Sequence, residues 1–451
     1  MTKIALIILL YFATSIPLTA APVSFSKDLA PILADKCLGC HEEDNDKGGY
    51  RVDTFHALLQ PGDSDETPVT PGKPDSGLFF HRLITDDEDD RMPQKDDPLP
   101  AAQIELFKRW IAEGAKFDGK DPQQSLASLM PKKPAVSAPD QYPQPLPITA
   151  LAWLPDQTTL LVSGYHEVTL WDSNTGKLKK RIPGLPERIF ALALHPDGKT
   201  LAVAGGVPGR SGELVIIDLN TGKPINTLPP GSDTQLAVAF SPNGELLAYA
   251  GTSNTVHVIK TKGWIPAWQV EAHADWITQL AFSPDSKLLA SASRDRTARS
   301  FQASNGDVLH TQTTHGNPVT SVIYSADSKR LFTAANNGEV RAAALNPEGQ
   351  LGTAVITGRR VEATRLAFAD NRLILASIDG RVRSFDITKK KDDKPLDLPP
   401  FGQRIDALAL HPEGKKLAIA GANGKVHLID LQEKKLLTSF TASPGFGIIS
   451  P

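Results

Sequence analysis

The C-terminal two thirds of the chain is built on an internal repeat. A landmark of the type Ala-Phe-Ser-Pro-Asp recurs at spacings of 41 to 46 residues, and its proline, or the alanine in its place, stands at Pro155, Pro196, Pro242, Pro284, Ala326, Ala369 and Pro412. Each landmark follows an alternating apolar run and precedes a second run of apolar and small residues, as 279–282 and 288–292 illustrate. Short strands repeated at this period are typical of propeller blades. Seven landmarks therefore predict an all-β, seven-bladed β-propeller over residues 147–451.

The best-formed repeat, residues 273–301, resembles the WD-repeat family. His273, Ser291 and Asp295 stand where that family builds a hydrogen-bond network in each blade. Phe301 replaces the usual tryptophan, which removes an indole donor. The resemblance covers residues 146–441 and implies a ring in which each blade packs against two neighbours. We expect residues 435–441 to form the outer strand of the last blade, with an added N-terminal strand at 140–146 as the alternative.

The repeats carry no motif for catalysis. They contain no cysteine, no phosphate-binding loop and no nucleophile motif. Their histidines are scattered over different repeats, and His195 and His411 precede landmark prolines at matching positions, which repeat structure produces without a metal. We therefore expect the propeller to be a binding platform with structural or solvent-facing histidines: His166, His195, His257, His273, His310, His315, His411 and His427.

Both cysteines of the chain lie in one short motif, Cys37-Leu38-Gly39-Cys40-His41. This is the spacing of c-type haem attachment, in which two thiols bond the two vinyl groups of one porphyrin and the next histidine binds the iron. The alternative is a disulfide or a thioredoxin-like redox pair, which does not require the histidine. The motif predicts one covalent haem c per chain, attached to Cys37 and Cys40, with His41 as the proximal axial ligand.

The segment around this motif has the pattern of a small all-α domain over residues 22–117. Ser26, a residue typical of helix caps, precedes an apolar-periodic stretch that runs into the motif. Near the other end, residues 104–111 place apolar side chains at helical spacing before Gly114. Two such helices can cross beside a porphyrin and bury it.

The distal ligand of the iron is narrowed by elimination. Met1 would leave with a signal peptide and Met130 lies in a stretch flanked by proline and lysine, so Met92 remains. A thioether suits low-spin haem iron, and a His/Met pair raises the reduction potential relative to a His/His pair. His56 and His81 are the competing ligands, and a methionine that only fills a gap beside the haem is the other alternative.

Residues 22–117 also resemble the planctomycete-type cytochrome c domain in the order of their motifs. The matching motifs are Phe25-Ser26-Lys27-Asp28, Pro31-Ile32-Leu33, Cys37 to His41, Pro71 to Ser76, Arg91-Met92-Pro93, Pro98-Leu99 and Trp110 to Ala115. The resemblance implies His41 and Met92 as the two axial ligands. Glu42 departs from the family, which often has glycine there, and adds charge at the haem edge.

Two segments lie outside these domains. Residues 1–21 have the layout of a secretory signal peptide, with Lys3, an apolar run over 4–12 and small residues at 19–21. We expect cleavage after Ala20 or Ala21 and export to the periplasm, with an uncleaved N-terminal anchor as the alternative. Residues 118–146 are rich in proline, serine, glutamine and lysine, and are expected to form an extended, unpacked linker.

Charge is distributed unevenly along the chain. Residues 22–120 carry 12 Lys and Arg against 21 Asp and Glu, a net charge of −9, whereas the residues after Lys120 sum to +5. The haem motif and the lack of a catalytic motif favour a single-electron carrier over an enzyme. The charge pattern favours an acidic haem module that faces a basic surface of a redox partner or of the propeller. The alternatives are a haem enzyme with a second cofactor on the propeller, like the cd-type nitrite reductases, and a haem-based sensor or scaffold. We expect no nucleic-acid partner, and no membrane contact beyond an N-terminal anchor.

Overall fold

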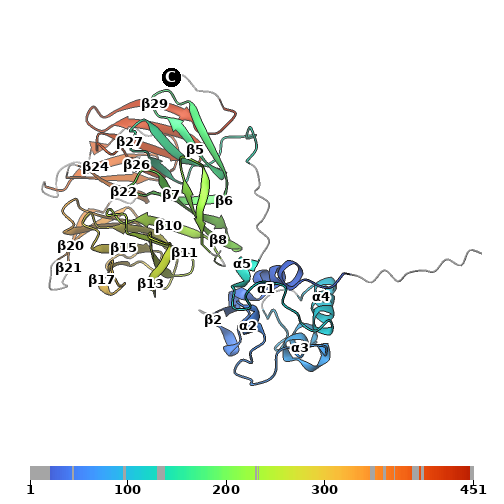
Figure 1. Ribbon diagram of the computed structural model, residues 1–451. Helices are drawn as coiled ribbons and strands as arrows, with labels where there is room; N and C mark the ends of the chain where they lie inside the picture. Colours follow the sequence, from blue (N-terminus) through green and yellow to red (C-terminus); the bar gives the residue numbers. More distant parts are fainter. Residues whose placement is uncertain are drawn as a thin grey trace, which may run out of the picture. The chain divides into compact units, whose positions relative to one another are not determined.

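The computed structural model describes residues 21–42, 45–94, 98–129, 138–228, 231, 233–345, 351–358, 362–369, 371–388, 396–397 and 401–446. The chain divides into two compact units, Met1–Pro131 and Lys132–Pro451 (Figure 1). The signal peptide predicted over 1–21 lies, apart from Ala21, outside the described residues, and so does Met130. Within the described ranges, no helix combines the length and the apolar character needed to cross a membrane.

The first unit folds into short helices. They are η1 (Phe25–Leu29), α1 (Ala30–Lys36), η2 (Leu38–Cys40), η3 (Lys47–Gly49), α2 (Phe55–Leu58), η4 (Pro74–Ser76), α3 (Leu78–Ile84), α4 (Ala101–Ala112) and α5 (Leu126–Leu129), together with a small hairpin of β1 (His41–Glu42) and β2 (Asn45–Asp46). Ser24 caps the first helix, because its Oγ accepts a hydrogen bond from Lys27 N at 3.0 Å. The cap is therefore two residues earlier than the Ser26 that the sequence suggests.

Aromatic side chains hold these helices together. Phe25 of η1 and Trp110 of α4 are both buried, with ring centroids 5.5 Å apart. Phe55 of α2 meets the Phe25 ring edge-on at 4.9 Å. The helix predicted from the apolar periodicity of 104–111 is confirmed, and α4 packs its apolar face against the first helix.

The second unit consists of antiparallel sheets. Its strands are β3 (Leu151–Trp153), β4 (Thr159–Ser163), β5 (Tyr165–Asp172), β6 (Leu178–Leu194), β7 (Thr200–Val207), β8 (Ser211–Asp218), β9 (Lys223–Thr227), β10 (Gln235–Phe240), β11 (Leu246–Gly251), β12 (Thr255–Lys260), β13 (Ile265–Glu271), β14 (Ile277–Phe282), β15 (Leu288–Ser293), β16 (Ala298–Gln302), β17 (Val308–Gln312), β18 (Val319–Tyr324), β19 (Arg330–Ala335), β20 (Glu339–Leu345), β21 (Leu351–Gly358), β22 (Ala363–Ala369), β23 (Arg372–Ser377), β24 (Val382–Asp386), β25 (Leu396–Asp397), β26 (Ile405–Leu410), β27 (Lys416–Gly421), β28 (Lys425–Asp430) and β29 (Lys435–Thr441).

The strands pair with their neighbours in chain order. From β10 onward they form successive four-stranded sheets, whereas β3 to β9 form one seven-stranded sheet. The long strand β6 explains the difference: residues 178–183 pair with β5, and residues 188–194 pair with β7. With β6 counted as two halves, the described strands fall into seven groups of four, one for each landmark. β29 is the outer strand of the last sheet, as predicted, and residues 140–146 form no strand.

The first strands of successive groups lie next to one another. The order of contact is β3, β6, β10, β14, β18, β22 and β26, and β26 in turn contacts β3. Threonines link these strands: Thr278 Oγ1 donates to Val319 O of the next group at 2.9 Å, and Thr320 Oγ1 donates to Ala363 O at 2.8 Å. Neighbouring sheets are thus joined by hydrogen bonds as well as by apolar packing.

Two histidines at matching positions make the same contact between groups. His195 Nε2 donates to Gly244 O at 3.0 Å, and the His195 ring meets the ring of Phe240 at 5.0 Å. His411 Nε2 donates to Gln157 O at 3.1 Å, and its ring meets Trp153 at 4.8 Å. The last group therefore contacts the first in the same way that the second contacts the third.

The WD-type network that the sequence suggests in residues 273–301 is assembled. His273 is buried between Asp295 Oδ2, 2.8 Å from its Nδ1, and Ser291 Oγ, 2.6 Å from its Nε2. Thr297 Oγ1 adds a hydrogen bond to Asp295 Oδ1 at 2.7 Å. Phe301, where the family usually has tryptophan, is fully buried, so it serves the fold as an apolar side chain without a donor.

The linker predicted over 118–146 is packed at both of its ends. Leu126 is fully buried in the first unit, and its N–H donates to Asp53 O at 2.8 Å. Tyr142 is buried in the second unit, and its N–H donates to Pro444 O at 3.1 Å. Packing therefore extends into the predicted linker from both sides, and its central part, 130–137, lies outside the described residues.

Acid is expected to destabilise the second unit through His315. Burial lowers the pKa of His315 to about 4, although Glu339 lies 3.7 Å from its Nδ1. An unfolded histidine has a pKa of about 6.5, so the unfolded chain binds the proton first. The contribution of His315 to the free energy of unfolding is therefore fully present above pH 6.5. It falls by roughly 3 kcal/mol between pH 6.5 and 4.

The measurement is the free energy of unfolding against pH for the wild type and for His315→Gln, whose amide can still donate to Thr333 Oγ1, the 2.7 Å partner of His315 Nε2. The free energy of unfolding of the variant should fall less steeply with acid than that of the wild type, because the variant lacks the titration of His315. Parallel pH profiles for the two proteins would contradict the prediction.

Candidate functional site

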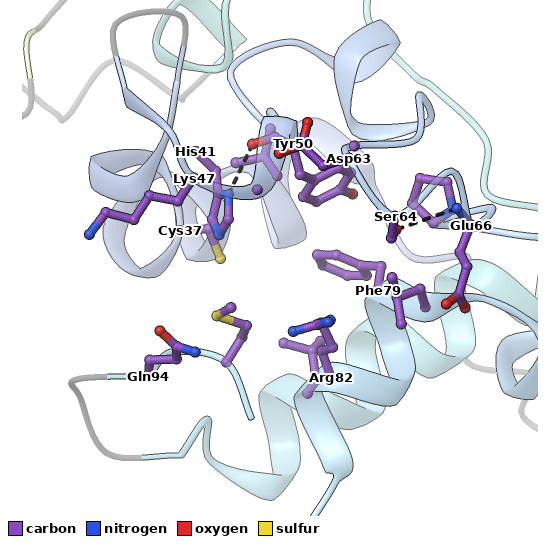
Figure 2. Close-up of a pocket in the computed structure, with 17 residues that line it drawn as sticks. Cys37, His41, Lys47, Tyr50, Asp63, Ser64, Glu66, Phe79, Arg82 and Gln94 are labelled. Atoms are coloured by element: carbon purple, nitrogen blue, oxygen red, sulfur yellow. Dashed lines mark hydrogen bonds between the residues drawn. The ribbon is translucent and has the colours of Figure 1, made fainter. Parts of the chain in front are cut away.

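A pocket of about 340 Å³ opens in the first unit. Apolar side chains of α3, Leu78, Phe79 and Leu83, form one of its walls. Three of the four residues that the sequence selects also line it: Cys37 and His41, which Figure 2 labels, and Met92. In Figure 2 the Cys37 sulfur faces the open middle of the pocket. The fold therefore brings His41 and Met92 to one pocket, although they are 51 residues apart in the sequence.

The imidazole of His41 is held in one orientation. Its Nδ1 lies 2.9 Å from Tyr50 O, and the ring meets the Tyr50 ring edge-on at 5.7 Å (Figure 2). The main chain of His41 is fixed as well, because its carbonyl accepts a hydrogen bond from Val52 N at 2.8 Å. A histidine whose Nδ1–H donates to a carbonyl leaves Nε2 unprotonated and available to a metal, which is how metal-binding histidines are usually oriented.

Tyr50, which the sequence does not single out, is itself anchored. Its hydroxyl donates to Leu58 O of α2 at 2.8 Å, and burial raises the pKa of that hydroxyl. Gly62 packs against the same loop, where an added Cβ would lie 2.4 Å from Gly48 O. The loop that presents the Tyr50 carbonyl to His41 is therefore fixed from two sides.

Met92 is held beside α3. Its N–H donates to Arg82 O at 2.8 Å, near the end of that helix. The Arg82 guanidinium lines the pocket and lies 3.3 Å from Asp90 Oδ1 in the acidic turn that leads to Met92. Asp87 shapes this turn, because its carbonyl accepts the N–H groups of Asp90 at 3.2 Å and of Arg91 at 2.8 Å.

The two cysteines have different surroundings. Cys37 is half-buried at the pocket, and burial raises the pKa of its thiol to about 12. Cys40 is exposed and is not among the residues that line the pocket. Both thiols are free, so the disulfide alternative has no counterpart in the described structure.

The two competing axial ligands lie elsewhere. His56 lines a separate pocket with Arg51 and Gln123. His81 is exposed on α3 and does not line the pocket of His41. Of the three distal candidates, Met92 is the one that shares a pocket with His41.

This set of side chains fits a haem. A thiol, an imidazole with a free Nε2 and a thioether surround an apolar pocket, which suits a porphyrin and the two axial positions of its iron. Lys47, Arg82, Ser64 and Gln94 also line the pocket and can meet the two carboxylates of the porphyrin. Sequence reasoning missed these four residues because none belongs to a motif.

Comparison with known proteins agrees with this geometry. Residues 37–96 match the family model of planctomycete cytochrome C, a span that includes Cys37, His41 and Met92. Residues 238–327 and 398–449 match the model of the WD40 domain of anaphase-promoting complex subunit 4. No curated protein matches the chain. Together the two matches support a haem-binding electron carrier fused to a repeat domain. The chain thus carries a segment that matches planctomycete cytochrome C, followed by segments that match a WD40 domain.

Proposed function

We propose that the chain is a monohaem c-type cytochrome that transfers single electrons, and that its repeat domain is the docking platform for a redox partner. The observation that carries this proposal is the shared pocket: Cys37 and His41 of one motif and Met92 of a distant segment all line it. Cys37 and Cys40 would hold the haem covalently, and His41 and Met92 would be its axial ligands. When bound, the haem supplies an iron that alternates between the ferric and ferrous states.

The protein's own residues prepare this site. The hydrogen bond from His41 Nδ1 to Tyr50 O fixes the plane and the tautomer of the imidazole. Leu78, Phe79 and Leu83 line the pocket and would exclude water from a bound haem, which would favour the lower charge of the reduced state. A thioether at Met92 works in the same direction, so the potential is higher than that of a bis-histidine site.

The repeat domain is proposed to be a seven-bladed propeller. Four observations support it: seven groups of four strands, first strands in contact from β3 to β26, contact of β26 with β3, and the matching interfaces of His195 and His411. Apolar residues of the first and last groups also share one core, which contains Trp153, Trp171, Leu428 and Phe440. A linear array of sheets would leave these surfaces uncovered.

The partner is proposed to carry a basic surface, and the protein to work in the periplasm. Asp86, Asp87, Glu88, Asp89 and Asp90 are exposed in the turn that leads to Met92, so they lie close to one edge of the pocket. A basic partner would be steered to that edge, with an association rate that falls as ionic strength rises. Export rests on the signal-peptide pattern of residues 1–21.

Loss of both cysteines is expected to abolish covalent haem. In the double variant Cys37→Ala/Cys40→Ala no thioether can form, so haem staining of a denaturing gel and the pyridine haemochrome spectrum should show no haem c. The wild type should show one haem c and no second porphyrin per chain, and a one-electron redox titration. Met92→Ala is the matched control, because it leaves both thiols in place and keeps the covalent haem. Covalent haem in the double variant, or a second porphyrin in the wild type, would overturn the proposal.

A further inference from the structure

Residues 139–148 lie along both the first and the last repeat of the second unit. Toward the last repeat, Tyr142 N donates to Pro444 O at 3.1 Å, Leu146 N to Ser443 Oγ at 3.0 Å, and Ile148 N to Gly421 O at 3.0 Å. Three main-chain donors in seven residues therefore hold this segment against β27 and the end of the last sheet.

Two glycines allow this close approach. Gly424 has a φ of +71°, and a Cβ there would lie 2.8 Å from Leu146 O. Gly445 has a φ of +96°, and a Cβ there would lie 2.8 Å from the Gln141 Cβ. Any other residue at either place would be strained and would push the segment away.

A buried ionic cluster holds the same segment to the first repeat. Glu167 is completely buried, and Arg181 meets its carboxylate with two bonds, Nε to Oε2 at 2.7 Å and Nη2 to Oε1 at 2.9 Å. The Tyr142 hydroxyl donates to Glu167 Oε1 at 2.7 Å. Arg181 also donates to the main-chain oxygens of Asp140 at 3.0 Å and Pro139 at 2.7 Å.

Within the described residues, the hydrogen bonds of this cluster go to residues 139–142 and not to other strands of the first repeat. A buried carboxylate is costly unless it is paired and fully hydrogen-bonded. Apart from the two bonds between them, the side chains of Glu167 and Arg181 form their hydrogen bonds mainly with residues 139–142. Removing the segment would leave a buried ion pair with unmet hydrogen bonds, so the cluster and the segment depend on each other.

We propose that residues 139–148 are a strap, locked by Tyr142, Glu167 and Arg181, that joins the first and last repeats and fixes the point at which the tether of the cytochrome domain leaves the repeat domain. This replaces a shared strand as the device that ties the two ends of the repeat domain together. The tether then begins at Pro139 and not at Ile148.

The strap sets how far the haem can travel, an argument that rests on the proposed electron-carrier function. From Leu129, the last residue of α5, to Pro139 there are ten Cα-to-Cα steps, which span at most about 35 Å. Release of the strap would extend the tether to nineteen steps, ending at Ile148. Because the maximum reach of a chain grows with its number of steps, release of the strap would nearly double the distance over which the haem can be carried from the repeat domain.

Hydrogen exchange of the haem-loaded full chain, read by mass spectrometry, tests the strap directly. The double variant Glu167→Gln/Arg181→Met removes the ion pair as a unit, and Tyr142→Phe removes only the hydroxyl. The matched control is Glu339→Gln/Arg341→Met, which removes a half-buried pair, 2.5 Å apart, in a different repeat.

We expect the peptide that covers 139–148 to exchange at least ten-fold faster in the first variant and measurably faster in Tyr142→Phe, while the control leaves it unchanged. Unchanged exchange in both strap variants would overturn the proposal, as would equal acceleration in the control, which would mean that the repeat domain opens as a whole. The haem absorption spectrum of the same samples reports on the cytochrome separately, so failure of the strap and failure of the proposed function are distinguishable.

Discussion

Replacing Met92 with alanine is expected to open the sixth coordination position of the haem-loaded protein. Met92 is the thioether that lines the pocket of His41, and its N–H is fixed to Arg82 O, so an alanine leaves the backbone in place and removes only the ligand. The ferrous variant should bind carbon monoxide fully at saturating gas, whereas the wild type should show no change in its spectrum. The reduction potential should fall because a soft ligand that favours ferrous iron is lost.

The controls for this experiment come from the other two candidates. His56→Ala and His81→Ala should leave the ferrous spectrum insensitive to carbon monoxide, since neither side chain lines the pocket. If His81→Ala opened the site and Met92→Ala did not, the axial assignment would be wrong. If Met92→Ala changed nothing, Met92 would be only a gap-filling side chain.

Local motifs made part of this site predictable. Cys37, Cys40 and His41 lie within five residues, so their chemistry is visible in the sequence alone. Met92 is predictable as the distal ligand because the chain has only three methionines. The role of Tyr50 is not predictable from the sequence, because it binds His41 through a main-chain carbonyl that any residue could supply.

The same contrast holds for the repeat domain. The landmarks predicted the number of strand groups, because a turn residue must recur wherever a first strand meets a second. They did not predict that β6 would run through two groups, since pairing on both sides of one long strand depends on register with β5 and β7. The strap was missed for a related reason: Tyr142 bonds to Glu167, which lies 25 residues away, and proline-rich composition alone favours an unpacked linker.

Closure of the repeat domain is expected to make Trp153 one of its most sensitive positions. Trp153 is buried, its Nε1 donates to Ala409 O at 3.1 Å, and its ring meets His411 of the last group. Trp153→Ala should therefore lower the free energy of unfolding by about 3–5 kcal/mol, the usual cost of truncating a buried large aromatic residue. Trp153→Phe keeps a ring and loses the indole hydrogen bond, so about 1 kcal/mol is expected.

A double-mutant cycle separates closure from ordinary packing. In a closed ring, Trp153→Ala and His411→Ala remove a shared contact, so their combined cost should differ from the sum by about 0.5–2 kcal/mol. The matched cycle is Phe240→Ala with His195→Ala, which probes the equivalent contact between the second and third groups. Denaturant unfolding followed by the β-sheet circular dichroism signal gives both coupling energies. If the ends of the array do not meet in solution, the Trp153–His411 coupling is zero while the Phe240–His195 coupling persists. Similar couplings in the two cycles would make the junction of the last and first repeats energetically equivalent to an internal junction, which is what a closed ring requires.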